Sequence, residues 1–345
     1  MSDTPRTMRA VRFLAPRQPF VLRAEPIPCP AQGQVRVCIK ACGICRTELH
    51  LRDGLLDLGR RDFTVGHEIA GVIDAVGDGV SASRIGERVV IYYYEGCGAC
   101  RHCRAGDEQL CPKPQSQPGF TTDGGYAEYI VVRARNCVKV PDHLALHDIA
   151  PMGCAGSTAV HAGRMAGITA GSWVVIYGVG GVGNALLQYA HALGGRVIAI
   201  GLGAEKLALA RELGAEIALD AAVETDIVGQ VLDITGEGAD VVFELVGTTE
   251  TMRRSVMMLR RRGRLVLIGY TAETLQIHPV ELIVREAILL ASVGSTLQDL
   301  HEIVDLVARG IVTSVVDRTL PLDRFAEGLD ALESQTPIGR IVLTM

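Results

Sequence analysis

Apolar and polar residues follow a different pattern in each half of the chain. From Trp173 to Val293, short apolar runs alternate with stretches of helical periodicity. Six strands are predicted, at Trp173–Tyr177, Arg196–Ile200, Glu216–Leu219, Asp240–Val246, Arg264–Ile268 and Ile288–Val293. Helical periodicity covers Ala185–Leu193, Glu205–Leu213 and Thr251–Arg260. Strands that alternate with helices predict an α/β fold built on a doubly wound parallel sheet.

The first ~150 residues carry short β-type runs that Gly and Pro interrupt, which predicts a compact, mostly β region. These runs lie at Val35–Lys40, Ile69–Val76, Arg88–Tyr94 and Tyr129–Val132. The tail from about Gly294 has two helical stretches and a β-like end at Gly339–Thr344, which we expect to pack on the first region. We therefore predict one domain from residues 1–155 and 294–345, and a second from residues 156–293.

Length, composition and charge argue against several classes of protein. The chain has 345 residues, a length typical of about two domains, with 48% hydrophobic and 21% charged residues and a net charge of −5. This acidic balance argues against a nucleic-acid partner. Met1–Ala10 has no apolar stretch typical of a secretory signal, and the longest apolar run, Ala287–Val293, is far shorter than the ~20 residues that span a bilayer. We expect a soluble, cytoplasmic protein with no membrane partner.

Four of the ten cysteines are clustered in one short segment. They follow the pattern C-x2-C-x2-C-x7-C, at Cys97, Cys100, Cys103 and Cys111. In a reducing compartment such clusters are typical of metal sites, and four thiolates on Gly-containing turns can surround Zn²⁺. A site with four protein ligands leaves no position for substrate, so a structural zinc is predicted. An iron–sulfur cluster is the main alternative, and plain buried thiols are another.

A glycine-rich loop follows the first strand of the second region. Its residues fit G-x-G-x-x-G, and the ones expected to bind a dinucleotide are Gly178, Gly180, Gly181, Val182 and Gly183. The strand before the loop and the helical pattern after it favour a Rossmann dinucleotide site over a simple packing turn. The second strand ends at Gly201, where an NAD enzyme usually has Asp or Glu, and Lys206 follows. NAD and NADP both stay open, with a slight preference for NADP.

Three more segments carry groups that can bind a metal. They are Cys42–His50, Gly66–Glu68 and Gly153–Thr158. Taken separately, each is also compatible with a buried thiol, a core histidine or a helix N-terminus.

In order along the chain, these segments, the four-cysteine ribbon and the glycine loop resemble the zinc-dependent medium-chain dehydrogenase/reductase family, of the alcohol dehydrogenase type. The resemblance extends from Met8 to Arg340. It implies a mostly β, GroES-like catalytic domain beside the Rossmann domain.

The resemblance implies a catalytic zinc held by Cys45, His67 and Cys154, with Glu68 as a neighbouring or transient ligand. Two cysteines and one histidine are the ligand set of alcohol dehydrogenase. Glu48 stands where the family usually has Asp, and it would support His67 with a side chain one methylene longer. Two zinc ions per chain are therefore expected.

The resemblance also implies a proton relay and further cofactor contacts. Thr47 would bind the substrate oxygen, and His50 would pass the proton to solvent. Arg46 and Arg340 would contact the pyrophosphate, and Thr158 would lie near the nicotinamide. The last residues of three later strands are further candidates for cofactor binding: Val246, Ile268 and Val293.

The sequence leaves the roles of Cys42 and of the run Tyr92–Tyr94 open. Cys42 and Cys45 could form a redox pair or half of a zinc knuckle, although Cys42 is better explained as a plain thiol, like Cys29, Cys38 and Cys137. Tyr92–Tyr94 either lines a substrate cleft or is an ordinary strand.

The predicted function is a zinc- and NAD(P)-dependent alcohol dehydrogenase that acts on a primary or secondary alcohol or the matching aldehyde or ketone, as a homodimer or homotetramer. A polyol- or carbonyl-specific enzyme of the same family is the alternative. A non-catalytic zinc- and nucleotide-binding protein is a third, disfavoured because no ligand or relay residue is missing.

Overall fold

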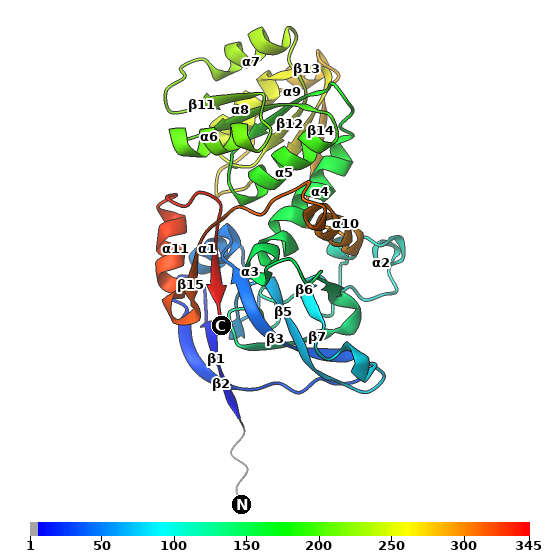
Figure 1. Cartoon of the computed structure of the whole chain (residues 1–345). Coiled ribbons are helices and arrows are strands. Elements are labelled where there is room, and N and C mark those ends of the chain that lie inside the picture. The colour runs from blue at the N-terminus through cyan, green and yellow to red at the C-terminus, as the bar shows by residue number, and fades with distance from the viewer. Residues whose placement is uncertain (1–5) are drawn as a thin grey trace, which may run out of the picture. The chain divides into compact units, whose positions relative to one another are not determined.

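The computed structural model describes residues 6–345 (Figure 1). The expectation that Met1–Ala10 contains no secretory signal falls in part on residues 1–5, which lie outside the described part. The chain forms two compact units. The first unit contains the chain up to Cys154, Ser295–Ala308 and Ser314–Met345, and the second contains Ala155–Gly294 and Arg309–Thr313.

The segment Arg309–Thr313 differs from the expected domain bounds, which place it in the first domain. It belongs to the second unit, where Gln188 Nε2 donates to Thr313 O over 2.9 Å and Thr313 N donates to Gln188 Oε1 over 2.7 Å. Because Gln188 lies about 120 residues earlier in the chain, periodicity around residue 309 gives no sign of this contact.

The second unit is a doubly wound parallel sheet, as the alternation of strands and helices predicts. Its six strands are parallel and lie in the order β11-β10-β9-β12-β13-β14. The strands are β9 (Trp173–Tyr177), β10 (Arg196–Gly201), β11 (Ile217–Asp220), β12 (Ala239–Glu244), β13 (Leu259–Leu267) and β14 (Ile288–Ala291). The helices are α4 (Ala155–Ala166), α5 (Gly181–Ala192), α6 (Ala204–Glu212), α7 (Ile227–Thr235), α8 (Thr249–Met257) and α9 (Pro279–Ile283).

Helices cover both faces of this sheet, and each face has its own apolar core. Alternate residues of β9 point to opposite faces, so Ile176 packs with residues of α4, α5 and α6, while Val175 packs with residues of α7 and α8. Burial on both faces explains why the strands appear in the sequence as nearly continuous apolar runs.

One predicted helix extends too far into its neighbour. The periodic stretch Thr251–Arg260 is helical only to Met257, and β13 begins at Leu259, well before the predicted start at Arg264. Leu259 is paired with Ala239 of the neighbouring strand, and Ala239 N donates to Met258 O over 2.8 Å. Sheet pairing therefore overrides the helical pattern at this point.

The first unit is mostly β, as predicted. It has a three-stranded sheet, β2-β1-β4, and a seven-stranded sheet in which β15-β16-β3-β5-β6-β8 are neighbours and β7 also pairs with β3. The strands are β1 (Thr7–Phe13), β2 (Val21–Pro26), β3 (Gln34–Gly43), β4 (Phe63–Thr64), β5 (Glu68–Val76), β6 (Arg88–Ile91), β7 (Tyr129–Arg133), β8 (Cys137–Lys139), β15 (Val316–Pro321) and β16 (Arg340–Thr344).

Short helices connect these strands. They are α1 (Arg46–Asp53), η1 (Ala82–Arg84), α2 (Arg101–Ala105), η2 (Glu108–Leu110), η3 (Ala134–Asn136), α3 (Leu146–Ile149), η4 (Ala150–Gly153), α10 (Leu297–Ala308), η5 (Leu322–Arg324) and α11 (Phe325–Glu333). The C-terminal strand β16 pairs with β3, with Val342 opposite Gly43. The C-terminal strand thus lies between β15 and β3 in the seven-stranded sheet.

A second predicted element is shorter than expected. The run Arg88–Tyr94 is a strand only as far as Ile91, because Tyr92 N donates to Asn136 O and the Asn136 side chain binds the carbonyls of Tyr92 and Tyr94.

Among residues 6–345, none of the helices has the length and apolar character needed to cross a bilayer.

Candidate metal centres and dinucleotide loop

Four side chains from distant segments meet in one buried group of the first unit. Cys45 precedes α1, His67 precedes β5, Glu68 is its first residue, and Cys154 follows η4. One ligand atom from each residue lies within 4.8 Å of the others, and all four residues are buried. Antiparallel pairing of Gly43 with Glu68 brings the end of β3 beside the start of β5. The fold therefore assembles the group that sequence spacing alone could not connect.

Glu48 orients two of these residues at once. Its Oε1 lies 2.9 Å from His67 Nδ1, and its Oε2 accepts a hydrogen bond from Cys45 N over 2.8 Å, which closes a capping box at the start of α1. Because Nδ1 faces the carboxylate, Nε2 is the nitrogen that can bind a metal. One carboxylate therefore contacts both residues.

The donor atoms fit a zinc ion. His67 Nε2 is buried and has no hydrogen-bond partner within residues 6–345, as expected for a nitrogen reserved for a metal. A hydrogen bond with Cys154 and the charge of Arg340 outweigh burial and hold the pKa of the Cys45 thiol well below its usual value. A low pKa favours the thiolate, which is the form that binds metals. Two sulfurs and one imidazole nitrogen match the ligand chemistry of a catalytic zinc.

Glu68 is paired with a buried cation. Arg340 Nη2 lies 3.0 Å from Glu68 Oε1 and 3.7 Å from Cys45 Sγ, and its side chain is 8% exposed. Burial, only partly offset by Arg340, raises the pKa of Glu68 to about 8. A Cβ at position 43 would lie 1.9 Å from Glu68 Oε2, so Gly43 makes room for this carboxylate.

The other residues assigned by resemblance have distinct positions. Thr47 Oγ1 lies 3.5 Å from Cys45 Sγ. His50 is partly buried on α1, and burial lowers its pKa below 6.5. Arg46 is exposed at the start of α1, and Thr158 is buried in α4 of the second unit. Contact of Arg46 and Arg340 with a pyrophosphate stays a prediction.

Cys42 stands apart from the metal group. Its side chain is fully buried in the apolar core of the first unit, and its Sγ lies 3.8 Å from Gly43 O. Burial raises the pKa of its thiol well above the usual value, which disfavours the reactive thiolate. Cys42 therefore has the environment of an inert core residue.

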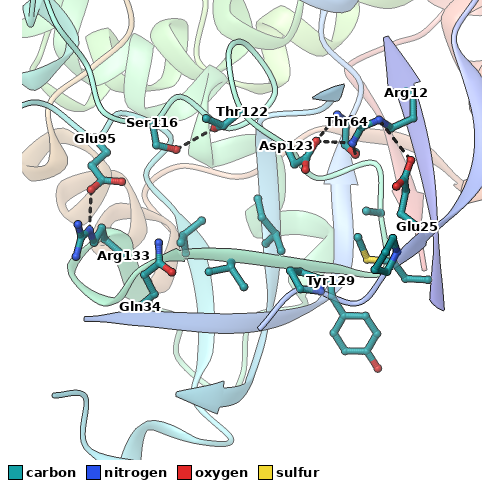
Figure 2. A pocket seen from close by; sticks show the side chains of 18 of the residues that line it. Arg12, Glu25, Gln34, Thr64, Glu95, Ser116, Thr122, Asp123, Tyr129 and Arg133 are labelled. Atoms are coloured by element: carbon teal, nitrogen blue, oxygen red, sulfur yellow. Dashed lines mark hydrogen bonds and ion pairs between the residues drawn. The ribbon is translucent and has the colours of Figure 1, made fainter. Parts of the chain in front are cut away.

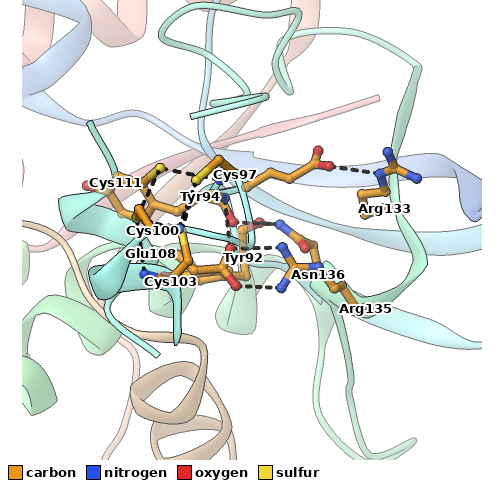
Figure 3. A network of polar contacts seen from close by, with 12 residues as sticks. Tyr92, Tyr94, Cys97, Cys100, Cys103, Glu108, Cys111, Arg133, Arg135 and Asn136 are labelled. Atoms are coloured by element: carbon orange, nitrogen blue, oxygen red, sulfur yellow. Dashed lines mark hydrogen bonds and ion pairs between the residues drawn. The ribbon is translucent and has the colours of Figure 1, made fainter. Parts of the chain in front are cut away.

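The four-cysteine ribbon forms the second group (Figure 3). Its sulfur–sulfur distances are 4.0 Å for Cys97 to Cys103, 3.5 Å for Cys100 to Cys103 and 3.9 Å for Cys100 to Cys111. A tetrahedral ion with bonds of about 2.3 Å requires sulfurs about 3.8 Å apart, so the spacing fits zinc. Backbone N–H groups of Cys97 and Cys100 point at ribbon sulfurs, at 3.3 and 3.4 Å.

The glycine loop lies in the second unit between β9 and α5. A Cβ on Gly183 would lie 2.0 Å from Gly178 O, so this tight turn requires glycine. A Cβ on Gly180 would meet nothing within 4 Å, which leaves the helix N-terminus open to a ligand. These features fit a bound pyrophosphate.

Most of the other candidate cofactor residues follow the carboxyl ends of parallel strands, the edge where such sheets bind ligands. Gly201 ends β10, and the others lie one or two residues beyond β12, β13 and β14: Val246, Ile268 and Val293. Lys206 lies on α6 and is partly exposed.

A cavity of about 660 Å³ lies elsewhere in the first unit, on the strands β1, β3 and β7 (Figure 2). Charged side chains that line the cavity form ion pairs with one another, as Arg12 does with Asp123 and Arg133 does with Glu95. None of its lining residues belongs to either cysteine group. Nothing in its chemistry points to a ligand.

Comparison with known proteins agrees with this arrangement. Residues 31–142 match the family model "Alcohol dehydrogenase GroES-like domain", and residues 181–309 match "Zinc-binding dehydrogenase". An alcohol dehydrogenase of Geobacillus stearothermophilus is 35% identical over 95% of this chain and 96% of its own length. An NAD-dependent alcohol dehydrogenase of Sulfurisphaera tokodaii is 33% identical, with 97% and 99% covered.

The crystal structure of the alcohol dehydrogenase from Aeropyrum pernix is also similar, with a TM-score of 0.91 and 33% identity over 98% of this chain and 100% of that chain. A GroES-like unit joined to a doubly wound nucleotide-binding unit defines a two-domain dehydrogenase. The chain belongs to the zinc-dependent medium-chain dehydrogenase/reductase family, in its alcohol dehydrogenase branch, and is an oxidoreductase.

Proposed function

We propose that this protein transfers hydride between NAD(P) and a primary or secondary alcohol, or the matching aldehyde or ketone. The observation that carries the proposal is the buried convergence of Cys45, His67 and Cys154, with His67 Nε2 buried and lacking a hydrogen-bond partner among residues 6–345. A polyol or another carbonyl compound is the alternative substrate, since the shape of the substrate pocket decides between them.

Cys45, His67 and Cys154 would hold a catalytic zinc, and Cys97, Cys100, Cys103 and Cys111 would hold a structural one. Zinc in the first group supplies a Lewis acid that lowers the pKa of an alcohol hydroxyl and polarises a carbonyl in the reverse direction. Three protein ligands leave one position of a tetrahedral site for substrate, and four leave none. Glu68, paired with Arg340, is proposed as a transient ligand.

Thr47 and His50 would move the proton. Thr47 Oγ1 lies 3.5 Å from Cys45 Sγ, a position that supports a hydrogen bond to a substrate oxygen beside the ligands. Because burial lowers the pKa of His50 below 6.5, its imidazole is neutral at pH 7 and can accept a proton.

The cofactor is proposed to be NAD or NADP, with a slight preference for NADP. Gly201 has no side chain to bind the ribose 2′-hydroxyl or to repel a 2′-phosphate. A Cβ at this position would lie 2.3 Å from Val179 Cγ2, so the loop valine occupies the space that an acidic side chain would enter. Lys206 on the following helix supplies a positive charge.

A homodimer or homotetramer is proposed for the assembly. The edge strand β14 and the neighbouring α9 region expose large apolar side chains, with Ile283 71%, Val284 61% and Ile288 41% exposed. Such a surface is typical of a protein interface. A cytoplasmic location is also proposed, because none of the ten cysteines, all of which lie within residues 6–345, forms a disulfide, as is typical of a reducing compartment.

The experiment that tests the function follows nicotinamide absorbance over a panel of primary alcohols, secondary alcohols and polyols, once with NAD and once with NADP. We expect oxidation of a simple alcohol, two zinc ions per chain by metal analysis, and kcat/KM with NADP at least equal to that with NAD. Preference for NAD by more than about tenfold would contradict the cofactor assignment, and lack of turnover on all three substrate classes would contradict the function.

A further inference from the structure

Asn136 holds the segment Tyr92–Tyr94 at two points. Its side-chain Nδ2 donates to Tyr92 O over 2.9 Å and to Tyr94 O over 2.8 Å, and its backbone O accepts from Tyr92 N over 2.8 Å (Figure 3). Asn136 is 3% exposed, so water does not compete strongly for these bonds. The carbonyls on both sides of Tyr93 are therefore fixed.

These hydrogen bonds of Asn136 hold Tyr93 in a position that faces the proposed metal ligands. The Tyr93 hydroxyl lies 3.9 Å from Cys154 Sγ, its ring meets the His67 ring edge-on with centroids 5.1 Å apart, and it stacks on Phe120 at 5.5 Å. Tyr93 is 2% exposed. A buried phenol in contact with sulfur acts as the donor, because the thiolate has no proton to give.

The two thiolate ligands thus meet donors from different parts of the chain. Arg340 Nη2 lies 3.7 Å from Cys45 Sγ, and the Tyr93 hydroxyl lies near Cys154 Sγ. Hydrogen bonds to metal-bound sulfur withdraw electron density from it and tune the metal. A donor at each sulfur would make the ion a stronger Lewis acid than two bare thiolates allow.

We propose that Tyr93 is a positioning residue that donates a hydrogen bond to the metal ligand Cys154, and that Asn136 holds Tyr93 in place for this bond. The inference rests on the proposed zinc function. It assigns the middle tyrosine of the Tyr92–Tyr94 run to the metal centre instead of to a strand.

The test uses the full-length protein loaded with Co²⁺, whose thiolate-to-metal absorption reports on the sulfur ligands. The spectrum of a Cys45→Ser variant, which retains only the ribbon, is subtracted to isolate the catalytic site. Tyr93→Phe keeps the ring and removes the hydroxyl, and we expect it to shift the charge-transfer band. We also expect EDTA to remove the catalytic metal about tenfold faster.

Tyr92→Phe is the matched control, because the Tyr92 hydroxyl donates to Ser295 O over 2.8 Å and not to a ligand. It should leave the band in place. Asn136→Ala should shift the band in the same direction as Tyr93→Phe but by less, because Tyr93 is loosened and not removed. A folded Asn136→Ala variant with an unshifted band would contradict the role of Asn136.

A catalytic-site band that is the same in Tyr93→Phe and wild type overturns this inference and leaves the proposed function intact. A shift of equal size in Tyr92→Phe also overturns it, since the effect would then be general packing. Absence of any catalytic-site band in the wild type overturns the zinc function and this inference together.

Discussion

The two cysteine groups of the first unit bring together similar ligands by opposite means. The ribbon takes four thiolates from 15 consecutive residues, and three of these cysteines are partly exposed. The group around Cys45 takes its ligands from three segments spread over more than 100 residues, and all of them are buried. Charged side chains surround the group around Cys45, with Glu48 fully buried and Arg340 nearly so.

This difference fits the role proposed for each group. In the ribbon, backbone N–H groups serve the sulfurs, so tight turns are sufficient for a closed site. The charges of the buried group are removed from water, so each needs a neighbour of opposite charge. Arg340 is that neighbour for Glu68 and for Cys45. A closed local site suits a structural ion, and a buried site with balanced charges and an open ligand position suits catalysis.

The strongest way to separate the two groups is to replace a catalytic ligand. We expect Cys45→Ser to lower alcohol oxidation by about a thousandfold or more, because the Lewis acid supplies several kcal/mol of transition-state stabilisation. Metal analysis should fall from two zinc ions per chain to one. Cys42→Ser, which changes a core thiol outside the group, should keep both ions, and full activity in Cys45→Ser would refute the ligand assignment.

Replacing a ribbon ligand should affect folding more than chemistry. Because a structural zinc contributes its binding free energy to folding, we expect Cys103→Ser to lower the free energy of unfolding by about 3 kcal/mol or more, measured by urea denaturation. Activity per folded molecule should fall less than tenfold. Cys29→Ser, at an exposed thiol, is the control with no expected change, and a stable Cys103→Ser protein with two bound zinc ions would count against the ribbon assignment.

Removing the charge of Glu48 should weaken only the buried group. We expect Glu48→Gln to lower zinc affinity at the catalytic site about 10- to 100-fold in chelator competition, because the carboxylate orients His67. Glu48→Asp should recover part of the loss, since the shorter side chain keeps its charge but cannot make both contacts equally well. Unchanged affinity in Glu48→Gln, or an equal loss at the ribbon, would mean that Glu48 does not act through His67.

The smallest expected effect concerns the support of the ribbon. Burial alone would raise the pKa of Glu108, but hydrogen bonds from Arg135, at 2.9 Å, and from Gly96 N, at 2.8 Å, outweigh it and lower the pKa below 4.5. A lowered pKa means that Glu108 stabilises the fold above about pH 4.5 and that this contribution is lost as the pH falls further.

We therefore expect Glu108→Gln to reduce stability at pH 7 by at most about 1 kcal/mol and to have less effect at pH 3.5. Urea denaturation of both proteins at the two pH values measures this difference. A loss that is larger at the acidic pH would have the wrong sign for a carboxylate with a lowered pKa.

Parts of the fold that depend on local pattern were predictable. The six parallel strands follow from their apolar runs, and both the ribbon and the glycine loop follow from spacing within a few residues. The errors occur where a distant partner decides. Asn136 ends the strand at Ile91, and pairing with Ala239 converts Leu259 from helix to strand.

The catalytic group could be predicted only through family resemblance, because no spacing links Cys45, His67 and Cys154. Even resemblance gave no sign that Glu48 binds Cys45 N as well as His67. It also left the position of Tyr93 open, since three consecutive tyrosines are compatible both with a strand and with a segment that lines a cleft.

The amino-acid sequence by itself determined the sites that short stretches of backbone can form, namely the four-thiolate ribbon and the strand–glycine loop–helix unit. Only the tertiary structure decided which thiols gather in the buried group and which, like Cys42, lie apart from it in the apolar core. The physical reason is that local geometry is set by neighbouring residues, whereas burial and balanced charge arise only when distant segments pack together.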